Sequence, residues 1–264
     1  MVKVLGQRVD APTHYAPEIL ERIVRQPRDS VTGYGFDIWH LYELSWLVES
    51  GSGEVGSSHY VGVLTIPADS AHTVESKSLK LYLNSLNFHK FASDDQALIC
   101  IRADLEVVLG VRPDLAIVAP SDIHQITREP VGELLDGLVE PAPSANDLAN
   151  LQQPDGVMEE VSLVTHRLRS LCPVTAQPDW ATLAIRYTGT ELNRSALMAY
   201  VDSFREHKDF HERCIETIFN QLCHNLTPTN LVVSGYFQRR GGIDITPHRS
   251  MHPTEPSLHR MGRQ

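Results

Sequence analysis

The chain has 264 residues, of which 42% are hydrophobic and 21% charged, a composition typical of globular proteins with a substantial core. Its formal net charge of −10 argues against a surface built to grip nucleic-acid phosphates or anionic lipid, so we expect no direct nucleic-acid binding. A local basic pocket for a small anionic ligand remains compatible with this charge.

Cysteine usage and hydropathy predict a cytoplasmic protein. The four cysteines are sparse and include no CxxC pair, which does not fit a disulfide framework; they are Cys100, Cys172, Cys214 and Cys223. Cys100 and Cys214 fall on apolar faces of predicted helices. No stretch approaches the ~20 apolar residues of a membrane-spanning helix, and the first residues lack a signal-peptide core. We therefore expect no membrane span.

A long hairpin behind an irregular N-terminal arm is the first predicted structure. The arm, residues 1–30, has a short helical pattern near 17–26. Apolar and polar residues partly alternate over 36–47, and a second strand rich in β-branched residues covers 60–66. The Gly- and Ser-rich run 51–58 between them predicts a turn or loop.

Two helices and a strand follow. The first helix has Ser76 as its expected N-cap, and its apolar stripe consists of Leu79, Tyr82, Leu83 and Leu86. The second opens with a capping-box pattern over 93–96 and stops at Gly110. Its apolar face consists of Leu98, Ile101, Leu105, Val108 and Leu109. A strand is predicted over 115–119.

The second half of the chain shows the same order of elements. Strands are predicted over 160–168 and 180–187, followed by a helix capped by Asn193. The apolar face of that helix consists of Leu197, Tyr200, Val201 and Phe204. A further helix carries Phe210, Cys214, Ile215, Ile218, Phe219 and Leu222. Strands over 230–238 and 242–246 come last, and the tail from Pro247 is expected to be weakly structured.

A short internal repeat supports two related halves. Residues 82–90, YLNSLNFHK, align without a gap with residues 200–208, YVDSFREHK. Together with the shared strand–strand–helix–helix order, this match favours two α+β halves. The expected organisation is an arm (1–30), a first half (31–127), a proline-containing connection (128–158) and a second half (159–264).

The clearest candidate for chemistry is the loop around Cys172, which Pro173 and Pro178 stiffen. A thiolate is a nucleophile, and Asp179, seven residues on, could protonate a nitrogen when a carbon–nitrogen multiple bond is attacked. That role requires burial to raise the pKa of the Asp179 carboxyl. A buried, inert thiol beside a turn-forming aspartate is the structural alternative.

A second cluster runs from His207 to Glu212. Asp209 and Glu212 fit a helix capping box, whereas a buried Glu212 carboxylate would also accept two hydrogen bonds from a flat, amidine-like edge. His207 and His211 are spaced i, i+4, which together with Cys172 would suit zinc. The residues alone leave these interpretations open.

Two further segments carry positive charge that would suit a phosphate. Lys77 and Lys80 lie in the first turn of a helix whose amide groups would also bind an anion. The segment 238–242, QRRGG, predicts a strand–turn–strand with two guanidinium groups. A solvated helix turn and an ordinary hairpin are the structural alternatives. No GxGxxG follows a strand, so a Rossmann-type site is not expected.

These segments resemble the NADPH-dependent 7-cyano-7-deazaguanine reductases, the nitrile reductases of queuosine biosynthesis, a tRNA modification. Residues 75–85, ESKSLKLYLNS, resemble the family signature, and residues 171–180, LCPVTAQPDW, resemble its catalytic loop. His211-Glu212 and residues 239–245, RRGGIDI, match further family segments. The resemblance runs over nearly the whole chain, in the long form with two halves.

The resemblance implies tandem tunnelling folds (T-folds), each an antiparallel sheet backed by two helices, in a homodimer. It implies that a nitrile is reduced to 7-aminomethyl-7-deazaguanine with two NADPH and no metal. Cys172 would form a covalent thioimide with the nitrile carbon, and Asp179 would donate the proton. The base would be held by His211, Glu212, Val74, Glu75 and Ser76. NADPH would be contacted by Ser76, Lys77, Arg240 and Gly241.

Two other functions stay open. A zinc-dependent hydrolase of the same fold, like the GTP cyclohydrolases, would use Cys172 with His207 and His211 as ligands. A non-catalytic binder of purine- or pterin-like ligands would hold the base without turnover. Stoichiometric zinc would indicate the hydrolase, and function that survives Cys172→Ala would indicate the binder.

Overall fold

A computed structural model describes residues 10–26, 33–49, 53–138, 147–153 and 155–264. The chain divides into two compact units: unit 1 comprises Met1–Pro27, Ile38–Thr127 and Arg239–Asp244, and unit 2 comprises Arg28–Asp37, Arg128–Gln238 and Ile245–Gln264. In its described part, each unit combines antiparallel strands with two α-helices, which confirms the predicted α+β class. Within the same residues, no helix has the length and apolar character needed to cross a membrane.

The strands of unit 1 include β2 (Tyr34–Glu49), β3 (Val55–Pro67) and β6 (Asp114–Val118), in the order β6-β3-β2. β3 and β6 are antiparallel, and the short β5 (Lys90–Phe91) pairs in parallel with β2. The predicted strands are present, but β3 is longer than expected and includes residues 55–58 of the predicted loop. Residues 51 and 52 of that loop lie outside the described residues.

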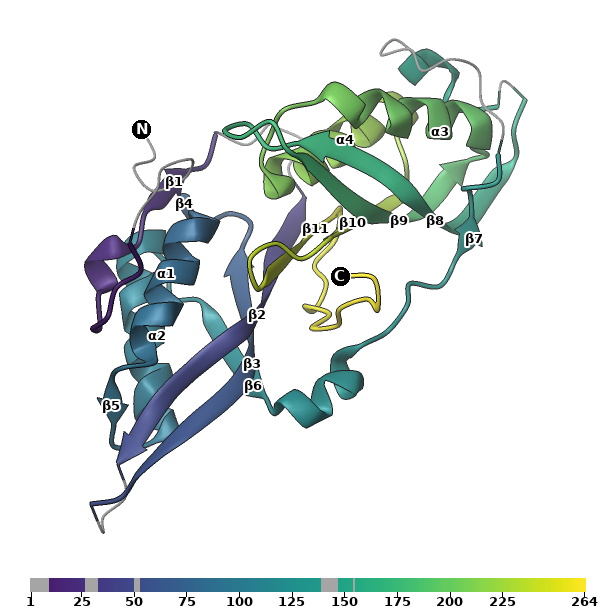
Figure 1. The fold of residues 1–264 in the computed structure, drawn as a ribbon. Coiled ribbons are helices and arrows are strands. Elements are labelled where there is room, and N and C mark those ends of the chain that lie inside the picture. The colour runs from purple at the N-terminus through teal and green to yellow at the C-terminus, as the bar shows by residue number, and fades with distance from the viewer. Residues whose placement is uncertain (1–9, 27–32, 50–52, 139–146, 154) are drawn as a thin grey trace. The chain divides into compact units, whose positions relative to one another are not determined.

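Two helices, α1 (Ser76–Leu86) and α2 (Asp94–Leu109), cover one face of these strands (Figure 1). The predicted stripe of α1 is fully or almost fully buried. Ser93 caps α2 by accepting from the amide of Gln96, and Gly110 ends it at φ 72°, both as predicted. The predicted N-cap of α1 is wrong by one residue, because Glu75 caps the helix. A 3-10 helix, Pro120–Ile126, follows β6.

The N-terminal arm is tied to the segment before α1. A 3-10 helix covers Pro17–Ile19, and β1 (Arg22–Val24) pairs antiparallel with β4 (His72–Val74). The helical pattern expected near 17–26 is therefore wrong beyond the first turn. Pairing between β1 and the distant β4 therefore overrides the local helical pattern. The same pairing continues at its end, where the amide of Glu75 donates to the carbonyl of Glu21 at 2.8 Å.

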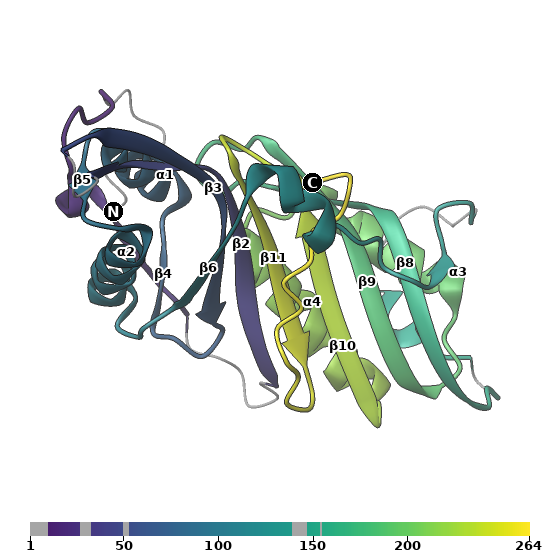
Figure 2. The same cartoon turned by 90° about the horizontal axis from the view of Figure 1, so that it is seen from below.

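Unit 2 contains a sheet ordered β11-β10-β9-β8-β7, with α3 and α4 on one face (Figure 2). Its strands are β7 (Glu133–Leu134), β8 (Met158–Leu171), β9 (Pro178–Thr190), β10 (Asn230–Phe237) and β11 (Ile243–Ser250). Among the strand pairs described in this unit, β7–β8 is parallel and the others are antiparallel.

The prediction of a weakly structured tail from Pro247 is wrong for residues 247–250, whereas residues 251–264 form no helix or strand. β11 continues to Ser250, and all of its residues are buried. The polar side chains at its end have partners: Arg249 pairs with Asp37 at 2.8 Å, and His248 stacks on Phe36. Long-range partners of this kind leave no local pattern in the sequence.

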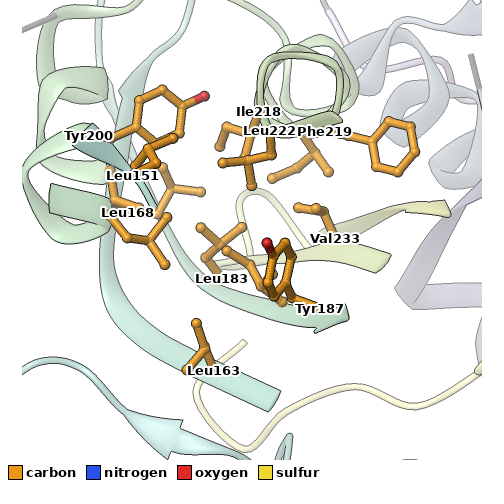
Figure 3. Packing of buried hydrophobic residues seen from close by; sticks show 14 of the residues in the cluster. Leu151, Leu163, Leu168, Leu183, Tyr187, Tyr200, Ile218, Phe219, Leu222 and Val233 are labelled. Atoms are coloured by element: carbon orange, nitrogen blue, oxygen red, sulfur yellow. The ribbon is translucent and has the colours of Figure 1, made fainter. Parts of the chain in front are cut away.

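The helices of unit 2 are α3 (Arg194–Asp202), capped by Asn193 as predicted, and α4 (His211–Leu226). Phe204, expected on the first helix, lies in a 3-10 helix over Ser203–Glu206. Side chains of both helices meet Leu168, Leu183 and Val233 of the sheet in one core (Figure 3).

Another 3-10 helix covers Asp147–Asn150. Among the described residues of the segment 128–158, Leu135 and Leu151 belong to the core, and Leu138 and Leu148 pack against it.

Candidate active site

Cys172 stands at the start of the tight connection between β8 and β9 in unit 2. Its amide donates to the carbonyl of Gln177, and the amide of Ala176 donates to the carbonyl of Cys172, both at 2.9 Å. Ala176 adopts a left-handed conformation with φ 54° to close this turn. The thiol-bearing residue is half-buried, while residues 173–178 are exposed. The hairpin therefore presents Cys172 on a well-defined backbone.

The other cysteines occupy different environments. Burial raises the pKa of the Cys214 thiol to about 12 and that of Cys223 to about 11, so both are held as thiols. Cys100 is half-buried, and its sulfur lies 3.1 Å from the hydroxyl of Tyr15. The predicted apolar setting is confirmed for Cys214 and wrong for Cys100, which has polar neighbours in Tyr15 and Asp104.

Asp179 is buried in β9, where it faces Ser170 of β8 in the strand register. Its Oδ1 lies 3.3 Å from Nε2 of His211, the first residue of α4. The His211 ring stacks on Phe237 with centroids 3.9 Å apart and planes 7° apart, while its Nδ1 is buried without a hydrogen-bond partner. The structure thus brings two predicted site residues into contact.

Glu212 is buried in the first turn of α4, where the helix dipole favours a negative charge. The predicted capping box does not form, because Phe210 is the N-cap and no side chain caps the helix. Asp209 instead accepts from the adjacent amide of Phe210. The helix-cap interpretation of Glu212 is therefore wrong.

The zinc set considered from the sequence is not assembled. Over the described part of the chain, no three His, Cys, Asp or Glu residues are grouped so that they could hold a metal ion. His211 faces Asp179, and His207 lies 3.7 Å from Asp209, so each histidine has a carboxylate neighbour in place of the Cys172 sulfur.

Unit 1 contains the other predicted binding residues. Val74 is buried at the end of β4, and Ser76 is exposed at the start of α1. The Glu75 carboxylate is fully buried, which raises its pKa, and accepts from the amides of Lys77 and Ser78 at 2.8 and 2.7 Å. The expectation that these helix amides bind phosphate is wrong, since Glu75 already occupies them.

The RRGG segment forms the turn between β10 and β11. Arg240 and Ile243 exchange two backbone hydrogen bonds around Gly241 and Gly242, which have φ of 56° and 80°. Positive φ at two consecutive central residues is typical of type I′ turns, which favour glycine there. A Cβ on Gly241 would lie 3.4 Å from Nζ of Lys80 in α1. The two predicted basic segments therefore meet within unit 1.

Comparisons with known proteins identify the family of the chain. Residues 12–116 match the family model for the N-terminal part of the nitrile reductase, 7-cyano-7-deazaguanine-reductase, and residues 178–256 match that of the QueF-like protein. A relative from Acinetobacter baumannii (strain SDF), named NADPH-dependent 7-cyano-7-deazaguanine reductase, is 39% identical over 99% of this chain and 98% of its own. Proteins of the same name from Acinetobacter baylyi and Teredinibacter turnerae are 38% and 40% identical, over 93% and 96% of this chain and 92% of theirs.

Among solved structures, the archaeosine synthase QueF-Like in its apo form aligns with 39% of this chain and all of its own, at 16% identity and a TM-score of 0.31. On the full-length sequence matches, the chain belongs to the family of NADPH-dependent 7-cyano-7-deazaguanine reductases.

Some neighbours of the site had no usable signal in the sequence. Phe237, the support of His211, reads as one more apolar residue of a strand. Tyr42 of β2 and Asp244 of β11 lie next to the RRGG turn, and the hydroxyl of Tyr42 donates to the Asp244 carboxylate. Their separation by about two hundred residues hides this contact from any local pattern.

Proposed function

We propose that this protein reduces the nitrile of 7-cyano-7-deazaguanine to the primary amine 7-aminomethyl-7-deazaguanine with NADPH, in queuosine biosynthesis. The observation that carries the proposal is the β8–β9 hairpin. It holds a half-exposed thiol at Cys172 and a buried carboxyl at Asp179, 3.3 Å from His211. The family membership of the chain supports the assignment of substrate and reaction.

Cys172 is the nucleophile. Its sulfur bonds to the nitrile carbon, the carbon–nitrogen triple bond becomes a double bond, and the nitrogen takes up a proton. Asp179 donates that proton, and the proton that leaves the Cys172 thiol passes to the Asp179–His211 pair, so S–H is added across the nitrile with no net change in charge. His211 lies close enough to hold the Asp179 carboxyl in position and to share a proton with it. The product is a thioimide on Cys172.

When bound, NADPH supplies the hydrides, two per turnover, that convert the thioimide to the amine. A nitrile is a poor hydride acceptor, and covalent attachment to sulfur makes the carbon easier to reduce. Once the first hydride has added to this carbon, loss of the Cys172 thiolate leaves an imine that water would hydrolyse. Exclusion of water from the pocket is therefore part of the proposed reaction.

The base is held by Glu212 and His211. A buried carboxylate at a helix N-terminus accepts two hydrogen bonds from the amidine-like edge of a deazaguanine. The same proposal gives Val74, Glu75 and Ser76 contacts to the base. Glu75 would use lone pairs that its helix amides leave available, since each carboxylate oxygen can accept more than one hydrogen bond.

The proposed NADPH contacts are Ser76, Lys77, Arg240 and Gly241. They suit a phosphorylated ligand because cationic side chains surround a turn whose glycine backbone allows close approach. We further propose a cytoplasmic homodimer without a metal. Sparse cysteine usage supports the compartment, and the family resemblance of the sequence supports the dimer.

The test is turnover with defined reactants. Purified protein, 7-cyano-7-deazaguanine and NADPH should consume two NADPH per nitrile and yield the amine, measured by absorbance and mass spectrometry. No NADPH oxidation with this nitrile would contradict the proposal. Stoichiometric zinc with GTP hydrolysis would identify the hydrolase instead, and tight base binding that is unchanged in Cys172→Ala without turnover would identify a binder.

A further inference from the structure

A chain of buried polar side chains lies next to the RRGG turn in unit 1 and ends on an arginine. Nδ1 of His40 is 2.7 Å from Oδ1 of Asp244, and both side chains are 0% exposed. The other carboxylate oxygen of Asp244 accepts from the hydroxyl of Tyr42. The guanidinium of Arg239 lies over the Tyr42 ring, with Cζ 4.6 Å from the ring centroid.

Burying this polar chain carries an energetic cost. An imidazole and a carboxylate lose their hydration on burial, and apolar residues in their place would stabilise the core at least as well. Alternate residues of a strand lie on the same face of the sheet, so His40 and Tyr42 of β2 share a face, and both contact Asp244 of β11 there. The turn is also anchored there, because the amide of Tyr42 donates to the carbonyl of Gly242 at 2.9 Å. The network therefore fixes one aromatic ring beside the turn.

Arg239 is placed to bind an anion. Stacking on an aromatic face occupies the flat side of a guanidinium and leaves its in-plane N–H donors directed outward. The residue is exposed, and no carboxylate of the described residues forms an ion pair with it. The neighbouring Lys80, by contrast, already pairs with Glu43 at 3.3 Å. Of these two cations, Arg239 has more charge available for a ligand.

We propose that Arg239 binds the 2′-phosphate of NADPH and so selects it over NADH, and that Tyr42, Asp244 and His40 position Arg239. The inference rests on the proposed NADPH-dependent reaction. A phosphate monoester accepts two parallel hydrogen bonds from one guanidinium, whereas NADH offers a neutral hydroxyl at the same place. Tyr42, Asp244 and His40 act through Arg239 without touching the cofactor.

Calorimetric titration of the full-length protein with 2′,5′-ADP and with 5′-AMP measures how much the 2′-phosphate contributes to affinity, because no reaction takes place. The wild type should prefer 2′,5′-ADP. Arg239→Gln should weaken 2′,5′-ADP by about 10- to 100-fold, the effect of losing a charged hydrogen-bonded pair, and leave 5′-AMP unchanged. Arg112→Gln is the matched control, since Arg112 is an exposed arginine of unit 1 with only a 3.9 Å ion pair, and it should bind both ligands like the wild type.

Two variants test the positioning network. Tyr42→Leu removes the ring and should weaken 2′,5′-ADP binding nearly as much as Arg239→Gln. Tyr42→Phe keeps the ring under Arg239 and loses only the hydrogen bond to Asp244, so it should weaken binding by about 3-fold. Thermal unfolding of each variant verifies that it is folded. In turnover, Arg239→Gln should raise the KM for NADPH, with kcat and the NADH kinetics nearly unchanged.

The outcomes separate this inference from the proposed function. Selective 2′,5′-ADP binding that depends on Arg239, in a protein that does not reduce the nitrile, would support the inference and contradict the proposed function. NADPH-dependent nitrile reduction with unchanged 2′,5′-ADP affinity in Arg239→Gln would overturn the inference alone.

Discussion

In each unit, the end of a strand meets the segment that leads into a helix, and the backbone contacts at this junction are the same. The polar side chains at the two junctions have different roles. The amide of Leu47 donates to the carbonyl of His89 in unit 1 at 3.0 Å, and the amide of Leu171 donates to that of His207 in unit 2 at 2.8 Å. The lysine after each histidine pairs in parallel with the leucine of its own unit: Lys90 with Leu47, and Lys208 with Leu171. The short sequence repeat thus extends to backbone geometry.

In unit 1 this junction is satisfied by its own side chains. Ser93 caps α2, and the Asp94 carboxylate accepts from Nε1 of Trp46 at 2.8 Å and from the hydroxyl of Tyr60 at 2.6 Å. In unit 2, α4 begins after Phe210 without a side-chain cap.

When the gapless alignment of the repeat is extended along the chain, His211 and Glu212 align with Ser93 and Asp94. Nδ1 of His211 has no hydrogen-bond partner although it is buried. One copy of the motif therefore stabilises the fold, and the other retains polar groups that a ligand can satisfy.

The largest difference between the two junctions should appear with the acids. Asp179→Asn removes the proposed proton donor and should lower turnover by about 10²- to 10⁴-fold, with base binding retained. In unit 1, Asp94→Asn removes an acid that only stabilises the fold, and it should lower the free energy of unfolding by about 1–3 kcal/mol with kcat nearly unchanged. Steady-state kinetics and urea unfolding measure both, and unchanged turnover in Asp179→Asn would remove it as the acid.

A buried histidine of unit 2, His248, should make the stability of the protein depend on pH. His40 in unit 1 faces a carboxylate, whereas His248 in unit 2 bonds the hydroxyls of Ser234 and Thr254. Burial, and then Arg186 and Arg249, lower the pKa of His248 to about 4 against a weaker opposing effect of Asp37.

The unfolded chain binds this proton near pH 6.5 and the folded chain only near 4. The stability from His248 is therefore complete above pH 6.5 and is lost as the pH falls towards 4, by about 3 kcal/mol. Urea unfolding at several pH values should show a shallower acid loss in His248→Asn. Equal pH profiles for the two proteins would refute this assignment.

Glu212→Gln tests the carboxylate that the capping box fails to explain. It should raise the KM for the nitrile substrate by about 10- to 100-fold, because a charged hydrogen-bonded pair is lost, with a smaller effect on kcat. Binding of the substrate to the variant, measured by calorimetry without NADPH, should weaken by the same factor. A purely structural Glu212 would instead change stability and leave substrate affinity intact.

The smallest expected effect is on the cap in unit 1. Ser93→Ala removes the side chain that accepts from the amide of Gln96 and should cost about 1 kcal/mol of stability. Turnover at saturating substrate should not change. A loss of turnover comparable to that of Asp179→Asn would mean that the first junction is not merely structural.

Local patterns predicted the elements that local interactions specify. The stripe of α1, the caps Ser93 and Asn193 and the Gly110 stop are all confirmed, since each depends on residues within one or two turns. The strand end at Ser250 could not be predicted, because it requires a buried ion pair between Arg249 and a residue more than two hundred positions away.

The site divides in the same way. Cys172 and Asp179 were identifiable because one hairpin carries both, and family resemblance assigned their roles. The contact of Asp179 with His211, the Phe237 support and the use of the α1 amides by Glu75 depend on tertiary structure. Each of these groups has several possible hydrogen-bond partners in the sequence, and the folded chain shows which partner it uses.

The central claim is that Cys172 is a covalent catalyst. Incubation of the protein with 7-cyano-7-deazaguanine in the absence of NADPH, followed by intact mass spectrometry, should show one ligand added to each chain. The adduct should persist in Cys100→Ala, which removes the other half-buried thiol, be absent in Cys172→Ala and be discharged by NADPH. No adduct on the wild type, or an adduct that survives in Cys172→Ala, would contradict the account.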